Sequence, residues 1–296
     1  MNNLPTMARV VALLGLALGL AGCAADRVGP DPGRSADLAR AAAGAATSPG
    51  HEFEAERELR PVDPGPRAPG IRAALASPER LPGDRPRDVV RRPERGLDFF
   101  GIRPGMQVLD LFAGGGYYSE IVARLVGGEG AVMAYNDAAF DRTAQRELVQ
   151  RFEPGRLPNV TVLTAEPDAL DLPEGHFDAA LLILAWHEMY RPVDRRRPAP
   201  EVRTRFLSEV YGALKPGAVL GVIDHAAAAG TPPEQAAALH RIDPVRLRQD
   251  MVAAGFVLEA DSDVLRNPGE NRSLGVFDPE VRGRTDQVVL RFRKPQ

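Results

Sequence analysis

The sequence predicts an α/β fold, namely a seven-stranded, mainly parallel sheet with helices on both faces. From about residue 100 onward, short apolar segments alternate with longer amphipathic ones, as in chains that alternate strand and helix. Residues 177–184 are nearly all apolar, which is typical of a strand covered on both faces. Helix-stop signals at Gly101, Lys215-Pro216-Gly217 and Gly255 separate the segments.

The predicted elements follow in chain order. A helix over residues 88–100, interrupted at Pro93, precedes the first strand. Asp137 stands where its carboxylate can cap the helix after the second strand. Strands are expected over 107–112, 131–135, 160–163, 177–184, 218–224, 256–261 and 285–293, and further helices over 117–126, 137–152, 203–214 and 243–254. In such a sheet a ligand lies beyond the carboxyl ends of the strands, so we expect the chemistry there.

Composition excludes several classes of protein. The chain has 296 residues, 44% hydrophobic and 26% charged, which is ordinary for a globular protein of one or two domains and excludes full disorder. A net charge of -3 gives no electrostatic case for a nucleic-acid partner. The single cysteine, Cys23, excludes an intrachain disulfide and a multi-cysteine zinc site.

The N-terminus has the features of an export signal. Arg9 precedes an apolar run over residues 10–20, which is short for a membrane span (~20 residues) and typical of a secretory signal. The run ends in Leu20-Ala21-Gly22-Cys23, which resembles the bacterial lipobox. The resemblance implies that residues 1–22 are a lipoprotein signal peptide and that Cys23 carries fatty-acyl chains such as palmitate. It also implies a lipid-anchored protein on the periplasmic side of the cell envelope, and Ala24 favours the outer membrane. The alternative is a plain secretory signal with a chance cysteine.

Residues 23–70 are rich in proline, glycine and alanine and show no sustained apolar periodicity. We interpret them as a tether. The domain organisation predicted is therefore a signal peptide over 1–22, a tether over 23–70 and one α/β domain over 71–296.

A glycine-rich turn follows the first strand. Gly114 and Gly116 let the backbone approach a ligand and present amides at a helix N-terminus. A dinucleotide fingerprint requires a third glycine where Ser119 stands, which disfavours a nicotinamide oxidoreductase. Asp110 at the strand end would repel a pyrophosphate but suits a cationic amino-acid ligand.

This pattern resembles motif I of the class I S-adenosylmethionine-dependent methyltransferases. Segments 159–170, 172–178 and 214–220 resemble later motifs of that family in the same order, and segments 99–105, 114–118, 240–244 and 276–279 resemble a group of bacterial predicted methyltransferases. The resemblance implies a Rossmann-like fold whose last strand is antiparallel, S-adenosyl-L-methionine as the cofactor, and a small-molecule acceptor of unknown identity.

The resemblance also implies a set of cofactor-binding residues. These are Asp110, Phe112, Ala113, Gly114, Gly116, Tyr117, Asn136, Glu166 and Asp168. Two positions depart from the family. Phe112 stands where the first glycine is usual, and Asn136 stands where an acid usually holds the ribose hydroxyls. An Asn136→Asp substitution is therefore expected to tighten cofactor binding.

Four residues are candidates for catalysis, and one of them, His240, lies in the loop before the last predicted helix. His187 and Glu188 follow the fourth strand, opposite the methyl group in this family, and His225 follows the fifth. A histidine there is a candidate general base for a hydroxyl or amine acceptor; the alternative is that each caps a strand or bonds a carbonyl. We expect no metal, because these positions together with Asp224 do not reproduce the Asp and Asn ligands of catechol-type O-methyltransferases.

Other side chains near the strand ends have two interpretations. Trp186 and Tyr190 either line an acceptor pocket or belong to the core. Residues 195–197, three arginines, form either a solvated turn or a site for an anionic acceptor or lipid headgroup. For the whole protein, the alternative to an active enzyme is a non-catalytic ligand-binding or scaffold lipoprotein that retains the fold.

Overall fold

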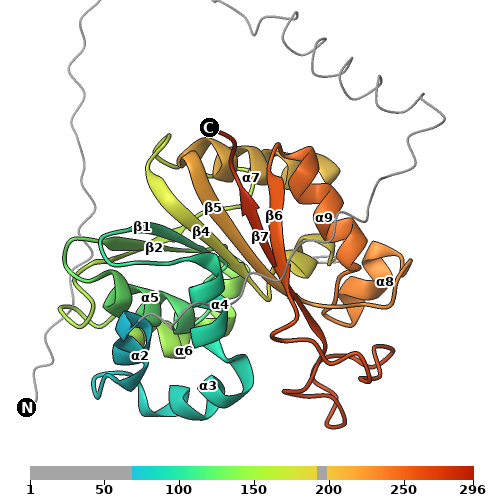
Figure 1. Ribbon diagram of the computed structural model, residues 1–296, viewed down its shortest axis with the longest axis horizontal. Coiled ribbons are helices and arrows are strands. Elements are labelled where there is room, and N and C mark those ends of the chain that lie inside the picture. Colours follow the sequence, from blue (N-terminus) through green and yellow to red (C-terminus); the bar gives the residue numbers. More distant parts are fainter. Residues whose placement is uncertain (1–68, 192–198) are drawn as a thin grey trace, which may run out of the picture. The chain divides into compact units, whose positions relative to one another are not determined.

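Seven strands form one sheet in the order β3-β2-β1-β4-β5-β7-β6 (Figure 1). The computed structural model describes residues 69–191 and 199–296, so the export signal, Cys23, nearly all of the tether and residues 195–197 lie outside the described residues. β7 is antiparallel to both of its neighbours, and the other pairs are parallel. The predicted α/β fold with an antiparallel last strand is confirmed. The strands are β1 Gln107–Leu111, β2 Ala131–Asn136, β3 Val160–Thr164, β4 Phe177–Ile183, β5 Leu214–His225, β6 Val257–Ser262 and β7 Gln287–Arg293.

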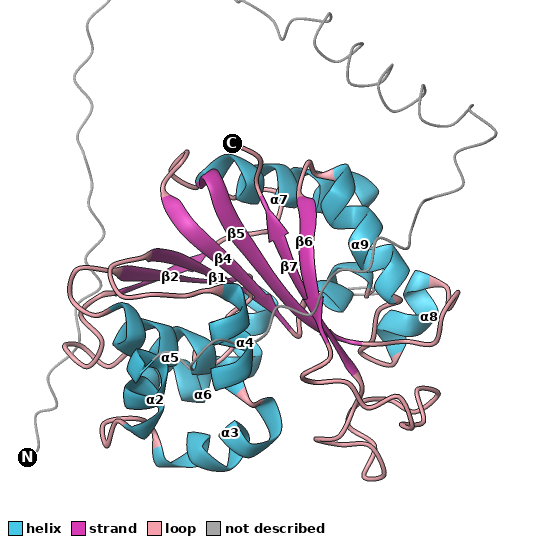
Figure 2. Ribbon diagram, in the orientation of Figure 1, coloured by secondary structure: helices cyan, strands magenta, loops and turns pink. Residues whose placement is uncertain are grey.

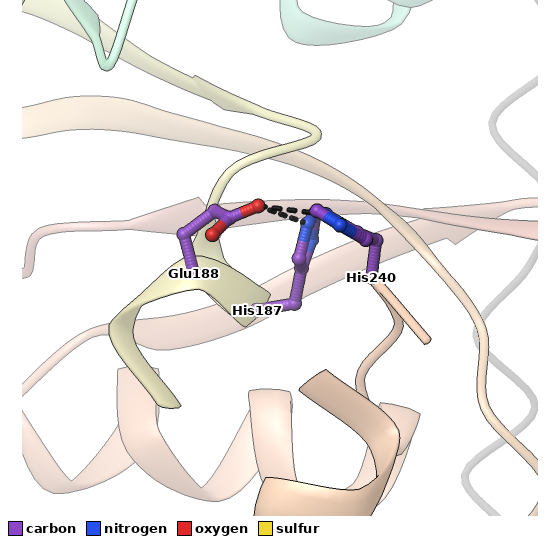
Figure 3. A group of neighbouring side chains, drawn as sticks. All are labelled: His187, Glu188 and His240. Carbon is purple, nitrogen blue, oxygen red and sulfur yellow. Dashed lines mark hydrogen bonds and ion pairs between the residues drawn. The ribbon is translucent and has the colours of Figure 1, made fainter. Parts of the chain in front are cut away.

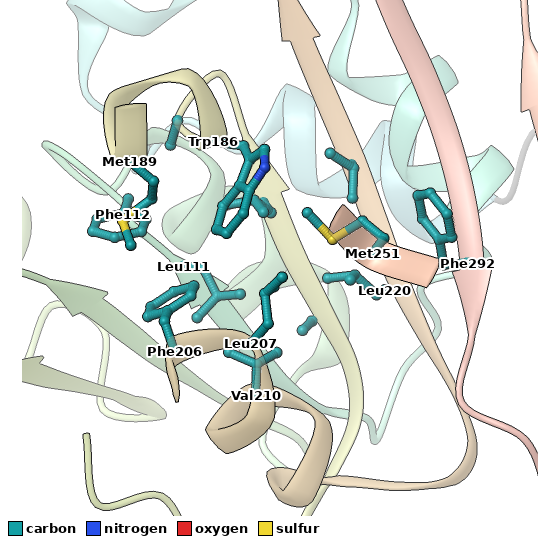
Figure 4. Packing of buried hydrophobic residues seen from close by; sticks show 14 of the residues in the cluster. Leu111, Phe112, Trp186, Met189, Phe206, Leu207, Val210, Leu220, Met251 and Phe292 are labelled. Carbon is teal, nitrogen blue, oxygen red and sulfur yellow. The ribbon is translucent and has the colours of Figure 1, made fainter. Parts of the chain in front are cut away.

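Helices cover both faces of the sheet (Figure 2). Side chains of α2, α4 and α5 share one buried cluster with Val108 and Leu181, whereas side chains of α7 and α9 share the other with Leu109 and Leu182 (Figure 4). The alternation along β1 and β4 therefore divides the core into two layers. The helices are α2 Pro69–Ala76, α3 Arg85–Arg91, α4 Pro93–Phe100, α5 Tyr117–Val126, α6 Ala138–Arg151, α7 Pro200–Ala213, α8 Pro233–Ala238 and α9 Pro244–Ala253, with 3-10 turns η1 Pro82–Asp84 and η2 Trp186–Tyr190.

Several local predictions are confirmed and one is corrected. The expected interruption at Pro93 separates α3 from α4 at Arg92, whose φ is 44°. The Asp137 carboxylate caps α6 by accepting from the amides of Ala139 and Phe140. The predicted start of the fifth strand was four residues late. β5 begins at Leu214, which pairs with Phe177 before a register shift, so the segment expected to be a turn is a bulge within the strand.

The connections around β1 and β4 run in opposite directions. From β1 the chain passes through α5 to β2 on one side, and from β4 it passes through α7 to β5 on the other. The carboxyl ends of β1 and β4 are therefore a topological switch point, where open α/β sheets bind ligands. Within the two described ranges, no helix is both long and apolar enough to cross a membrane.

Helix α6 is joined to the glycine turn through a buried arginine. Arg151 forms ion pairs with Asp84 (2.6 Å) and Glu120, and its Nε donates to the Gly115 carbonyl (2.5 Å). A Cβ on Gly116, whose φ is 75°, would lie 2.5 Å from the Phe152 ring. The close approach of α6 therefore requires glycine at position 116 irrespective of any ligand.

We expect Arg151→Met to lower the free energy of unfolding by about 3 kcal/mol, because it leaves two buried carboxylates without their shared cation. The value is at the low end for a buried pair, since other arginines still contact Asp84 and Glu120. Arg146→Met on the exposed side of the same helix is the matched control, with an expected change below about 0.5 kcal/mol. Denaturant unfolding of both variants checks this, and equal stabilities would contradict the structural role of Arg151.

Candidate functional site

The glycine turn begins where β1 ends. Phe112 has a φ of 52° and Gly114 a φ of 56°, so the chain reverses sharply before α5. Nothing lies within 4 Å of the position that a Cβ on Gly114 would occupy. A Cβ added at Gly115 or Gly116 would collide with side chains of α6 or of its C-cap residue, whereas one added at Gly114 would meet no atom.

Asn136, at the end of β2, holds this turn in place. Its Oδ1 accepts from the Gly114 amide (2.8 Å), and its Nδ2 donates to the Gly114 carbonyl (3.0 Å) and to Asp141 Oδ1 (3.0 Å). The residue is 1% exposed. The side chain that the sequence assigned to the ribose therefore forms a paired clamp on the backbone of the glycine turn.

Asp110 lies buried beside the turn and accepts a hydrogen bond from Ser119 Oγ (2.5 Å). Burial raises the pKa of Asp110 to about 6, although the bonds from Ser119 and the charge of Arg91 oppose the shift. The carboxyl group therefore titrates just below neutral pH, and a cationic ligand would favour its ionised form.

The other predicted cofactor residues take different places. The Phe112 ring packs against Tyr135, Phe140 and Phe206, with ring centroids 5.0–5.1 Å away, and so belongs to the core. Tyr117 is buried and its hydroxyl donates to Asp88 (2.6 Å). Ala113 is partly exposed within the turn, and its amide donates to the Tyr135 carbonyl. Glu166 and Asp168 are exposed on the loop after β3, with carboxylates available to a ligand at that end of the sheet.

A pocket of about 370 Å³ opens beyond the carboxyl ends of β4 and β5. The volume lies within the range of small-molecule sites. Its walls combine apolar side chains with polar and charged ones. The lining residues are Arg91, Ala139, Phe140, Thr143, Leu184, His187, Glu188, Arg191, His225, His240, Val276 and Phe277.

Three polar residues of the pocket and the buried Asp224 behind them form a chain of hydrogen bonds. His187 Nδ1 lies 2.7 Å from Asp224 Oδ1, and His187 Nε2 lies 3.2 Å from Glu188 Oε1. His240 Nδ1 approaches the same Glu188 oxygen at 2.8 Å (Figure 3). His225 stands apart, with its Nδ1 on Thr285 Oγ1 at 2.8 Å. The structure thus joins three of the candidate catalytic residues, His187, Glu188 and His240, and links them to Asp224.

The two strand-end histidines have opposite charge states near neutral pH. Burial alone would lower the pKa of His187, but the charge and hydrogen bond of Asp224, together with Glu188, raise it to about 9. Burial lowers the pKa of His225 to about 3, although Asp224 opposes this. His187 is therefore an imidazolium, which cannot accept a proton, whereas His225 is neutral. The Glu188 carboxyl, despite its burial, has a pKa held well below its usual range by His187 and His240.

Further residues near the strand ends lie either in the core or in the wall of the pocket. Trp186 and Tyr190 both bond Asp250 Oδ2 from buried positions (2.8 and 2.5 Å), and neither lines the pocket that contains the histidines. Leu184, which does line it, has a φ of 57° that turns the chain at the end of β4. Arg91 was not expected in the site, because it lies on a helix that precedes the first strand.

Comparisons with known proteins find methyltransferases. No family model matches the chain. The sterol 24-C-methyltransferase of Yarrowia lipolytica is 31% identical over 143 residues, covering 48% of this chain and 34% of the relative. The 2-phytyl-1,4-naphtoquinone methyltransferase of Synechococcus elongatus is 33% identical over 125 residues, covering 41% of this chain and 47% of the relative. The chain thus spans about a third to a half of the length of these curated relatives.

A solved structure shows the same fold. The cyclase SpnF superposes with a TM-score of 0.51 and 19% identity, over 71% of this chain and 82% of that chain. Likeness at this identity establishes the Rossmann-like fold alone. Because this neighbour is named as a cyclase, the fold does not by itself specify methyl transfer, and function must be argued from the site.

The hydrogen bonds between Asn136 and Gly114 change the effect that we expect of the Asn136→Asp substitution. Asn136→Asp removes the donor to the Gly114 carbonyl and places a second carboxylate against Asp141. We therefore expect the substitution to destabilise the protein by about 1–3 kcal/mol and to weaken ligand binding. Asp141→Asn in the same background should recover part of the loss, since it removes the like-charge contact.

Thermal unfolding and ligand titration of the single and double variants check this prediction. Tighter binding by Asn136→Asp than by the parent would contradict the clamp and support a direct contact with ribose.

Proposed function

We propose that the chain is an S-adenosylmethionine-dependent methyltransferase that acts on a small molecule. The observation that carries the proposal is the pairing of the glycine turn and buried Asp110 with an adjoining pocket at the switch point of the sheet. The similarity to sterol and naphthoquinone methyltransferases supports the same activity.

The residues present fit this cofactor. Asp110 is a buried acid whose one hydrogen-bond donor among the described side chains is Ser119, so it can take up the cationic amino-acid end of the ligand. Gly114 has open space on its Cα, and the exposed acids Glu166 and Asp168 stand at the end of β3, where the adenine would be held. The cofactor supplies a methyl group activated on a sulfonium, so the enzyme mainly has to align the acceptor.

In this proposal the chain's own residues perform three tasks. The apolar walls of the pocket, formed by side chains such as Phe140 and Phe277, hold the body of the acceptor and exclude water. Neutral His225 can accept a hydrogen bond from the hydroxyl of the acceptor and orient it, but its low pKa makes it too weak a base to keep the proton, which is lost to water. The His187 imidazolium contributes positive charge that stabilises the negative charge developing on the acceptor oxygen.

The side chains that line the pocket also indicate which class of acceptor it would bind. A small molecule with an apolar ring or chain and one ionisable hydroxyl matches a pocket whose apolar walls are combined with cationic and polar groups such as Arg91, His187 and His225. The relatives' names indicate molecules with apolar bodies, a sterol methylated at carbon and a phytyl-naphthoquinone, so they support the apolar part of this description. Incorporation of labelled methyl from S-adenosylmethionine into such compounds tests the transfer step.

Calorimetry of the full-length chain with S-adenosylmethionine, its demethylated product and NAD tests the cofactor. We expect micromolar or tighter binding of the first two and none of NAD. Binding of NAD alone would overturn the proposal. Cofactor binding without transfer to any acceptor would favour a non-catalytic lipoprotein that retains the fold.

Cofactor affinity should rise with pH between about 5 and 7, because a cationic ligand favours the ionised form of Asp110, whose pKa is about 6 without ligand. Asp110→Asn should weaken binding about ten- to a hundredfold, the equivalent of ~1.5–3 kcal/mol, and should abolish the pH dependence. Asp171→Asn, at an exposed aspartate, should preserve both. Titrations at several pH values check this, and an unchanged pH profile in Asp110→Asn would remove Asp110 from the site.

We also propose that Cys23 attaches the protein to a membrane of the bacterial envelope. In cells, Cys23→Ser should leave unprocessed precursor and abolish labelling with a fatty-acid analogue, since this is the chain's only cysteine. Unchanged labelling would contradict the lipobox interpretation.

A further inference from the structure

Three side chains from two separate segments meet at one edge of the pocket. His187 and Glu188 lie on η2 after β4, and His240 lies in the connection between α8 and α9. Each can offer one ligand atom such that all three atoms lie within 4.8 Å of one another (Figure 3). The convergence is separate from the glycine turn and Asp110.

The donor set is that of a transition-metal site. Two imidazole nitrogens and one carboxylate bind catalytic zinc and non-haem ferrous ions in proteins, with positions left open for water or substrate. Bonds of about 2.0–2.2 Å separate neighbouring ligands by roughly 3.3–3.6 Å in a tetrahedron. The two histidine nitrogens lie 3.2 and 2.8 Å from the same Glu188 oxygen, so small side-chain adjustments suffice.

A second carboxylate orients the first ligand. Asp224 is fully buried, accepts from the His187 backbone amide (3.0 Å) and contacts His187 Nδ1 (2.7 Å). This fixes the ring so that Nε2 faces Glu188 and His240. Metal-binding histidines commonly have such a carboxylate on the nitrogen away from the metal.

The backbone at His240 gives independent support. Its φ of 56° is uncommon for a residue with a side chain, and such strained conformations gather at functional sites. The imidazole also packs edge-on against the Phe277 ring, with centroids 4.8 Å apart. The chain thus maintains an unfavourable conformation that presents His240 Nδ1 to Glu188.

The charge around the cluster is compatible with a cation. Without a metal, the 3.2 Å contact between His187 Nε2 and Glu188 Oε1 is a hydrogen bond that needs a proton on one of the two atoms. Arg191 contacts both Glu188 oxygens (3.1 and 2.9 Å), but a carboxylate has about four acceptor positions and can keep this bond while it binds a metal. A divalent ion would replace the shared proton.

We propose that His187 Nε2, His240 Nδ1 and the Glu188 carboxylate bind a divalent transition-metal ion of the zinc or ferrous class, with an open position toward the pocket. The open position would take an oxygen of the acceptor. This inference goes beyond the proposed methyl transfer, because a bound ion would replace the His187 imidazolium as the positive charge beside the acceptor oxygen. It also departs from the sequence expectation of no metal.

The test is a titration of the full-length chain, freed of metal by chelation, with Co²⁺ and Zn²⁺ in the absence of S-adenosylmethionine. We expect one equivalent of Co²⁺ with the visible absorption of a low-coordinate site, and displacement of this absorption by Zn²⁺. Glu188→Gln and His240→Asn should abolish it. Asn tolerates positive φ, so His240→Asn keeps the local backbone.

Asp224→Asn should weaken Zn²⁺ binding about 10–100-fold, because it disturbs the orientation of His187 without removing a ligand. His176→Asn, at an exposed histidine, and His225→Asn, within the same pocket, are the controls and should bind as the parent does. Saturating Zn²⁺ should raise the Tm of the parent and both controls but not that of Glu188→Gln or His240→Asn.

Absence of stoichiometric Co²⁺ binding by the parent would overturn the proposal, as would parent-like binding by Glu188→Gln and His240→Asn. Loss of binding in either control would overturn the ligand set. Because no cofactor is present, these outcomes are independent of whether the chain binds S-adenosylmethionine.

Discussion

The site depends on one constraint of the sheet, which is that β1 and β4 are parallel neighbours whose connections leave in opposite directions. Their carboxyl ends therefore cannot both be covered by the connecting helices, and a crevice remains. On the β1 side the crevice holds the glycine turn and Asp110, and on the β4 side it holds η2 with His187 and Glu188.

A buried carboxylate on each side, Asp110 or Asp224, gives the β1 half and the β4 half of the crevice different electrostatic properties. Asp110 has little beyond Ser119 to stabilise its charge, so burial raises its pKa and leaves it receptive to a cation. Asp224 instead accepts the backbone amides of His187 and His225 and keeps His187 protonated despite burial. The β1 half is therefore suited to the cationic end of a cofactor, and the β4 half to an acceptor that develops negative charge. The same β4 half is the one that could exchange its shared proton for a metal ion.

Much of the fold was predictable because its signals are local. Alternating apolar segments, the capping Asp137 and the interruption at Pro93 each act over a few residues, and the structure confirms them. The site was predictable only where residues lie at strand ends. The clamp of Asn136 on Gly114 depends on the register between β2 and the turn, and the contact of His240 with Glu188 joins residues 52 positions apart in the chain. Neither contact leaves a pattern in a single sequence. Burial, which decides the charge states of His187 and His225, is likewise a property of the assembled core.

The most direct test of the central claim is a crystal structure of the chain with S-adenosylmethionine. The account predicts that the cationic amino-acid end of the cofactor lies beside Asp110 and Gly114 and that its methyl group points into the pocket between His187 and His225. A cofactor bound elsewhere on the sheet, or a methyl group directed away from these histidines, would contradict it.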